Sequence, residues 1–263
     1  MSLFIIGSAN RVTANIVLQL ARNAQYSSVT IADLLPTYQH HHRFYRLRRD
    51  LDNLQLNTSL TLTKLSAVND IFQHRDHSDV LFVTHDYYQH VTSKTKLMEL
   101  TAEACRKRDR VYFATPVEYD HFGFENPETN YLKAHNKVRE IAPQATIIRS
   151  DVQDKTETMA CINSSKGFID SRVFEFSANK NFSAKVVSSQ YYANVVCNAL
   201  RDKVVGKNLF VQGEKAKSSY EVGWARDVEK EEYSHAVQNI AQLTAKYNGI
   251  LGEGCERVAE VQH

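Results

Sequence analysis

The chain has 263 residues, of which 43% are apolar and 24% charged, and its formal net charge is +2. This composition is that of a globular protein with enough apolar side chains for a core, and no stretch reaches the roughly 18 uncharged apolar residues of a membrane-spanning helix. The four cysteines lie far apart and include no CxxC pair, which excludes a zinc knuckle or a redox CxxC motif and makes a reducing compartment the expectation.

Short apolar runs alternate with amphipathic segments over the first 150 residues. Strands are predicted at residues 3–6, 29–32, 60–63, 80–84, 111–114 and 145–148, and helices at 14–21, 40–54, 93–107 and 128–141. Strands that alternate with helices at intervals of about 30 residues form right-handed βαβ units. The sequence therefore predicts an α/β fold with a Rossmann-type, doubly wound parallel sheet that is covered by helices on both faces.

The alternation loosens beyond residue 150. Strands are predicted at 172–176 and 208–211, and helices at 191–201 and 231–247. We predict a Rossmann-type, degenerate dinucleotide-binding core over residues 1–150. Residues 151–263 are expected to form a C-terminal wall and interaction region within the same overall domain, with a small C-terminal α/β annex.

The first predicted strand ends at Gly7, directly before a helix, where a Rossmann domain binds a dinucleotide pyrophosphate. The segment GSANRVT at residues 7–13 keeps only the first glycine of the usual pattern, and Asn10 and Thr13 place side chains where glycines allow close packing. Arg11 can contact phosphate, and Asp33 at the end of the second strand favours NAD over NADP. The alternative is a plain strand–turn–helix in which Asp33 caps a loop.

Other patterns carry little chemistry. The run His40-His41-His42 lacks an HExxH or Cys/His framework, so no metal site is predicted. Thr84 ends the predicted strand at 80–84 and is expected to face the crevice, with a hydrogen-bonding role for Thr84-His85-Asp86 favoured over catalysis. The chain has no GxSxG elbow and no P-loop, which argues against a hydrolase or an NTPase.

Two segments resemble a known family. Residues 130–152, NYLKAHNKVREIAPQATIIRSDV, resemble the helix and strand that end in a "PEATIIRPSDI"-type segment in the dehydrogenase-like accessory subunits of mitochondrial complex I. Residues 182–200 and 206–210 are similar to a second segment of that family, with Gln190 in place of an Asp. Over roughly residues 3–225 the chain resembles the short-chain dehydrogenase/reductase superfamily, in its extended or atypical branch.

This resemblance bears on catalysis through Tyr131. In active members a Tyr acts as general acid/base, a Lys four residues later lowers its pKa, and a Ser from the preceding strand polarises the carbonyl. Tyr131 matches the Tyr, but His135 stands in place of the Lys, and Thr115 takes the approximate place of the Ser. Because a neutral imidazole lacks the Lys charge and neither Lys133 nor Lys137 has the i+4 spacing, we expect no catalytic residue and no enzyme activity.

The resemblance implies a non-catalytic accessory subunit of mitochondrial respiratory complex I, with a role in assembly and stability. Such a protein is peripheral on the matrix side of the inner membrane and contacts other subunits and lipid headgroups, with no nucleic-acid partner. NAD(H) or NADP(H) is held structurally, or no nucleotide is bound. The candidate cofactor-binding residues are Gly7, Ser8, Asn10, Arg11, Val12, Asp33, Thr84, Thr115 and Tyr131.

An alternative reading stays open. It is an atypical NAD(P)-dependent reductase or isomerase, or a nucleotide-sensing regulator similar to the NmrA-like branch, with a cytoplasmic location.

Overall fold

A computed structural model of the chain describes most of the predicted core. The described residues are 1–7, 9, 11–33, 38–64, 79–83, 91–108, 110–116, 127–150, 152–154, 183–213, 216–218 and 255–259. The predicted strand at 172–176 and the predicted helix at 231–247 lie outside them.

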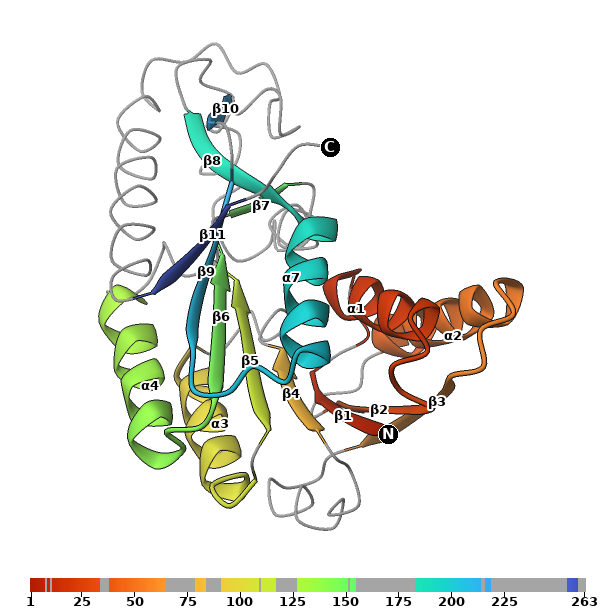
Figure 1. The fold of residues 1–263 in the computed structure, drawn as a ribbon, viewed down its shortest axis with the longest axis horizontal. Helices are drawn as coiled ribbons and strands as arrows, with labels where there is room; N and C mark the ends of the chain where they lie inside the picture. Colours follow the sequence, from red (N-terminus) through yellow and green to blue (C-terminus); the bar gives the residue numbers. More distant parts are fainter. Residues whose placement is uncertain are drawn as a thin grey trace.

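Eight of the described strands form one parallel sheet (Figure 1). Its order is β11-β9-β6-β5-β4-β1-β2-β3. The bounds are β1 Ser2–Ile6, β2 Ser28–Asp33, β3 Ser59–Lys64, β4 Asp79–Val83, β5 Val111–Pro116, β6 Thr146–Ser150, β9 Asn208–Gln212 and β11 Glu256–Ala259. The predicted Rossmann-type parallel sheet is confirmed.

Helices cover both faces of this sheet. They are α1 Arg11–Arg22, α2 Tyr38–Asn53, α3 Val91–Ala104, α4 Pro127–Ile141 and α7 Ser189–Arg201. The apolar residues of α1, α2 and α7 form one buried cluster with one face of the sheet, and those of α3 and α4 form a second cluster with the other face (Figure 1). Because both faces are buried, strands such as β1 and β4 are apolar throughout and show no alternation.

The helices form because their apolar residues repeat at helical spacing. In α1, Val12, Ile16 and Leu20 lie one turn apart and are at most 1% exposed. Helix α7 packs against α1 and has a defined start, since the Ser188 hydroxyl accepts a hydrogen bond of 3.1 Å from the Tyr191 N–H. None of the described helices is long and apolar enough to cross a membrane.

The C-terminal part contributes to the fold in two ways. Strands β9 and β11 extend the parallel sheet beyond β6. A separate three-stranded sheet is formed by β7 Val152–Asp154, β8 Ser183–Ser188 and β10 Ala216–Ser218, at the place of the predicted annex. The patterns of the sequence predicted β9 and α7, but not β7, β8, β10 or β11.

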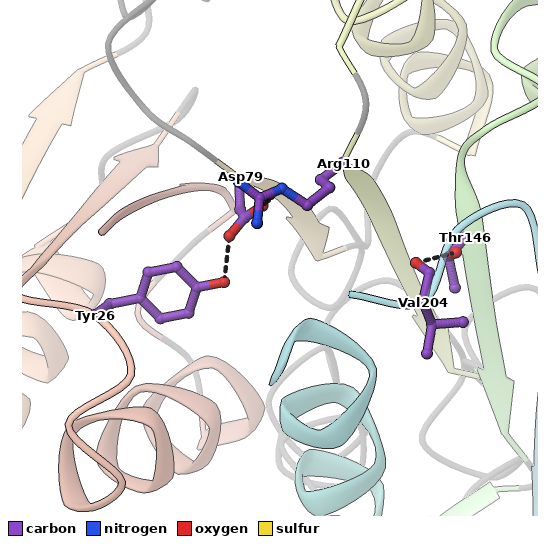
Figure 2. A network of polar contacts seen from close by, with 5 residues as sticks. All are labelled: Tyr26, Asp79, Arg110, Thr146 and Val204. Carbon is purple, nitrogen blue, oxygen red and sulfur yellow. Dashed lines mark hydrogen bonds and ion pairs between the residues drawn. The ribbon is translucent and has the colours of Figure 1, made fainter. Parts of the chain in front are cut away.

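A buried polar network joins the starts of β2, β4 and β5, at the amino ends of these strands (Figure 2). The Tyr26 hydroxyl donates a hydrogen bond of 2.5 Å to one carboxylate oxygen of Asp79, and the Arg110 Nε lies 2.8 Å from the other. Asp79 is 1% exposed, so these two partners compensate the cost of burying its charge. Burial and the neighbouring Asp79 raise the pKa of Tyr26 far above its usual value.

Candidate functional site

The carboxyl ends of the strands are where an open parallel sheet presents a ligand site. In this sheet β1 lies between β2 and β4, and the strand order reverses between β1 and β4. A crevice outside the carboxyl ends at such a reversal is the usual binding place in doubly wound folds. Gly7 follows β1 at this point.

Gly7 is held in a conformation and a space that suit only glycine. Its φ is +154°, and its N–H donates to the Ala32 carbonyl at 3.0 Å. A Cβ at this position would lie 2.9 Å from the Val83 carbonyl oxygen and 3.3 Å from the Val83 Cβ. The turn therefore packs directly on the end of β4, which fixes the path of the backbone from β1 into α1.

The residues after Gly7 differ in what they offer. Val12 is 1% exposed and Thr13 is fully buried, so both side chains lie in the core. Thr13 is therefore enclosed by the core and does not face solvent at the turn. The N–H groups in the first turn of α1 lack helical partners and are suited to an anion.

Several candidate residues fall beyond what the structure describes. Ser8, Asn10 and Thr84 lie outside the described residues. For Arg11, Asp33 and Tyr131 only the backbone is described: Arg11 begins α1, Asp33 ends β2 opposite Lys64, and Tyr131 lies in α4. The predicted roles of these side chains stay predictions.

A second group of polar side chains lies between the sheet and α4. Thr115 and Arg149 are register partners on β5 and β6. Each stands two residues after an apolar residue, Phe113 or Ile147, that packs with α3 and α4, so both side chains project toward that layer. His135 comes from α4, and the three residues are only 1–3% exposed.

Burial and the charge of Arg149 determine the protonation state of the His135 imidazole. Burial, with the positive charge of Arg149 as a second cause, lowers the pKa of His135 well below its usual value of 6.5. His135 is therefore neutral at neutral pH. The permanent charge in the group belongs to Arg149, because a guanidinium does not deprotonate in proteins.

The C-terminal strand reaches the same group. The Arg149 Nη1 donates to the Cys255 Sγ at 3.4 Å, just before β11. Burial raises the pKa of the Cys255 thiol, and Arg149 and Arg139 offset this only in part. Cys255 is therefore a thiol that packs on the guanidinium.

The lysines near Tyr131 do not supply an alternative ammonium where they are described. Lys137 is exposed, and its Nζ lies 2.9 Å from a Glu140 carboxylate oxygen. The side chain of Lys133 lies outside the described residues. In the part of the chain that the structure describes, no cluster of three His, Cys, Asp or Glu side chains is arranged to hold a metal ion.

Arg149 and Cys255 were not among the candidate site residues predicted from the sequence. Arg149 could have been noticed, since it is a charged residue directly after the predicted strand at 145–148, and β6 extends to Ser150. Cys255 had no such signal, because its approach depends on how β11 pairs with β9.

The comparisons with known proteins define the class of fold. No family model matches the chain, and no curated protein matches it in sequence. A nucleoside-diphosphate-sugar epimerase from Staphylococcus aureus matches in structure with a TM-score of 0.59 and 10% identity, over 96% of this chain and 92% of that chain. A triphenylmethane reductase from Citrobacter sp., complexed with NADP(H), matches with a TM-score of 0.60 and 10% identity, over 98% and 92%.

A third solved structure is a dTDP-glucose 4,6-dehydratase variant from Streptomyces venezuelae with NAD bound. It matches with a TM-score of 0.59 and 12% identity, over 99% of this chain and 85% of that chain. The chain thus has the Rossmann-type fold of NAD(P)-binding epimerases, reductases and dehydratases. At these identities the likeness shows the fold alone.

These comparisons correct one prediction. The expectation that the chain is not an enzyme is contradicted, because the proteins that share its fold over nearly their whole length are named as an epimerase, a reductase and a dehydratase. The expectation took the missing Lys and glycines as a loss of function. It did not count Arg149, which puts a fixed positive charge within electrostatic reach of His135. None of the comparisons supports the complex I subunit in particular.

Proposed function

We propose that the chain is an atypical NAD(P)-dependent reductase or isomerase that acts on a carbonyl or hydroxyl group of a small organic substrate. The observation that carries this proposal is the Gly7 turn, whose backbone packs on β4 and leaves no room for a Cβ. It stands at the reversal of strand order, directly before α1. The solved structures of the same fold include complexes with NADP(H) and with NAD.

The residues present fit a dinucleotide. The close packing of Gly7 on Val83 fixes the path of the backbone from β1 into α1, and the first turn of α1 offers N–H groups to a pyrophosphate. A bound nicotinamide nucleotide would supply or accept a hydride. Asp33 at the end of β2 makes NAD the preferred form in this proposal.

The polar group under α4 provides the chemistry of the chain itself. The Thr115 hydroxyl is buried and has no hydrogen-bond partner among the described residues, so we assign it to the substrate oxygen. Tyr131, one helical turn before His135, is the proposed proton donor and acceptor. In this proposal Arg149 takes the place of the missing ammonium, because a fixed positive charge favours the ionised form of a phenol that is brought close to it.

Turnover assays test this function. The full chain is mixed with NADH or NADPH and a panel of aldehydes and ketones, and the oxidation of the nucleotide is followed by its absorbance. We expect substrate-dependent oxidation of the nucleotide that falls by about 10²- to 10⁴-fold in Tyr131→Phe. The matched control, Tyr45→Phe on the outer face of α2, is expected to keep the rate.

The other outcomes separate the alternatives. Tight nucleotide binding without turnover would favour the nucleotide-sensing regulator over the reductase. Turnover that Tyr131→Phe leaves unchanged would contradict the assignment of Tyr131.

Association with a mitochondrial respiratory assembly on the matrix side stays a separate proposal. It rests on the sequence resemblance at residues 130–152, 182–200 and 206–210. Co-migration of the chain with a large respiratory assembly on a native gel would support it, whereas migration as a lone small oligomer would contradict it.

A further inference from the structure

The outer face of α2 carries an unusual concentration of arginine. One side of the helix is anchored in the core by Phe44, Leu47 and Leu51, which are at most 4% exposed. Away from the core the helix presents Tyr45, Arg46 and Arg49, and Arg48 is exposed on the flank, four residues after Phe44. We call these four residues the basic face of α2.

The three arginines of this face are not used within the described part of the protein. Arg46, Arg48 and Arg49 are exposed, and none of them forms an ion pair or hydrogen bond with a residue that the structure describes. Asp50 and Asp52 on the same helix do not pair with them. Elsewhere exposed cations do find partners, as Arg201 does with Asp202 and Lys137 with Glu140.

Tyr45 gives the basic face an amphipathic centre. It is 62% exposed, which makes it the most exposed large apolar side chain among the described residues. Its ring meets the buried Phe44 edge to face, with 5.9 Å between ring centroids. Arg48 and Arg49, three and four residues on, are its neighbours on the helix surface.

The shape of this face decides between anionic partners. Helix α2 lies at the outer end of its layer, beside α1 (Figure 1). Single-stranded nucleic acid is usually held in a groove, whereas the basic face is the outward side of one helix. A specific protein interface buries about 800 Å² on each partner and is usually centred on buried anchor residues, whereas this face carries charged side chains around one tyrosine. A lipid surface adapts to a convex helix and can place a headgroup at each guanidinium, with a tyrosine at the headgroup level.

We propose that the basic face of α2 is a docking surface for an anionic lipid bilayer. The arginines contact headgroup phosphates and carboxylates, and Tyr45 enters the headgroup region. Binding is reversible and salt-sensitive, because each arginine strengthens binding to an anionic surface by only about fivefold. This inference does not depend on the proposed reductase activity.

Vesicle co-sedimentation of the full chain tests the proposal. Vesicles of phosphatidylcholine with about 30% phosphatidylserine are compared with pure phosphatidylcholine at low and at physiological salt. We expect binding to the anionic vesicles only. The triple variant Arg46→Gln/Arg48→Gln/Arg49→Gln should lower the partition coefficient by roughly 10- to 100-fold, and Tyr45→Ser by several-fold.

A matched control separates this face from net charge. Arg22→Gln/Arg106→Gln/Lys107→Gln removes three exposed cations elsewhere and should keep most of the binding. Equal losses in the two triple variants would overturn the proposal, as would absence of wild-type binding to anionic vesicles at low salt. Binding of a single-stranded oligonucleotide that depends on the same arginines, with vesicle binding unchanged, would also overturn it by assigning the face to nucleic acid.

Discussion

Gly7 shows how one residue ties the fold to the candidate site. Its φ is positive, and a Cβ added there would lie 2.9 Å from the Val83 carbonyl oxygen, so both the backbone and the available space exclude a side chain. Gly7→Ala is therefore expected to lower the free energy of unfolding by about 1 to 3 kcal/mol and to weaken nucleotide binding. Chemical denaturation and a fluorescence titration with NADH measure the two effects.

Gly206 is the matched control for this substitution. Its φ is +68°, but a Cβ there would meet only the Pro143 carbonyl, at 3.4 Å. Gly206→Ala should cost about 1 kcal/mol and leave nucleotide binding unchanged. If both variants bind NADH like the wild type, Gly7 has no part in a nucleotide site.

His135 predicts an acid-side loss of stability. Its folded pKa lies below 6.5, mainly through burial, so below pH 6.5 the unfolded state binds the extra proton. The free energy of unfolding is therefore unaffected by His135 above pH 6.5. It falls as the pH drops from 6.5 toward the folded pKa, by at most about 1.4 kcal/mol per pH unit. Denaturation of the wild type and His135→Gln between about pH 5 and 7 should give a shallower pH dependence for the variant; parallel curves would refute the assignment.

Substitution of two buried tyrosines by phenylalanine should have opposite effects on the free energy of unfolding at neutral pH. The Tyr112 hydroxyl has no hydrogen-bond partner among the described residues, whereas the Tyr26 hydroxyl donates to Asp79. Tyr112→Phe should be neutral or raise the free energy of unfolding by about 1 kcal/mol, and Tyr26→Phe should lower it by about 1.5 to 3 kcal/mol. Urea denaturation at neutral pH distinguishes the two, and a larger loss for Tyr112→Phe would contradict the account.

Tyr112 also makes an alkaline prediction. Burial, the largest cause, and Asp79 raise the pKa of Tyr112 to about 12 from 10. The folded state favours the protonated phenol, so the free energy of unfolding is unaffected by this group below pH 10 and falls as the pH rises from 10 toward about 12. The stability of Tyr112→Phe should therefore fall less than that of the wild type over this window.

At the scale of elements, Arg139 joins α4 to the segments that precede β6 and β9. Its guanidinium donates to the carbonyls of Pro143 and Ala145 at 2.9 and 2.7 Å, and to that of Gly206 at 2.7 Å. Arg139→Met leaves these carbonyls without a donor and should lower the free energy of unfolding by about 1 to 3 kcal/mol. Arg201→Met, which breaks only an exposed ion pair with Asp202, should leave the denaturation midpoint nearly unchanged; equal shifts would contradict this role.

The sequence predicts elements well where periodicity is strong. The apolar runs of β1, β2, β4 and β5 and the amphipathic repeat of α1 mark their positions to within a few residues. It fails for β11, because Glu256–Ala259 is short and half polar, and only pairing with β9 makes it a strand. The candidate site follows the same rule: Gly7 is found from the strand that precedes it, whereas the approach of Arg149 to His135 and Cys255 depends on tertiary contacts.

At the scale of the whole molecule, the sheet order explains why the polar residues gather as they do. Gly7 follows β1, and Thr115 and Arg149 stand near the carboxyl ends of β5 and β6. Because the strands are parallel, all their carboxyl ends lie on the same side of the sheet. The Tyr26–Asp79–Arg110 network lies at the amino ends of the strands (Figure 2) and stabilises the fold instead.

Calorimetric titration of the full chain with NADH and with NADPH tests the central claim most directly. The account predicts saturable binding with one site per chain, tighter for NADH because of Asp33, and weakened in Gly7→Ala but not in Gly206→Ala. Absence of saturable binding for both nucleotides would contradict it.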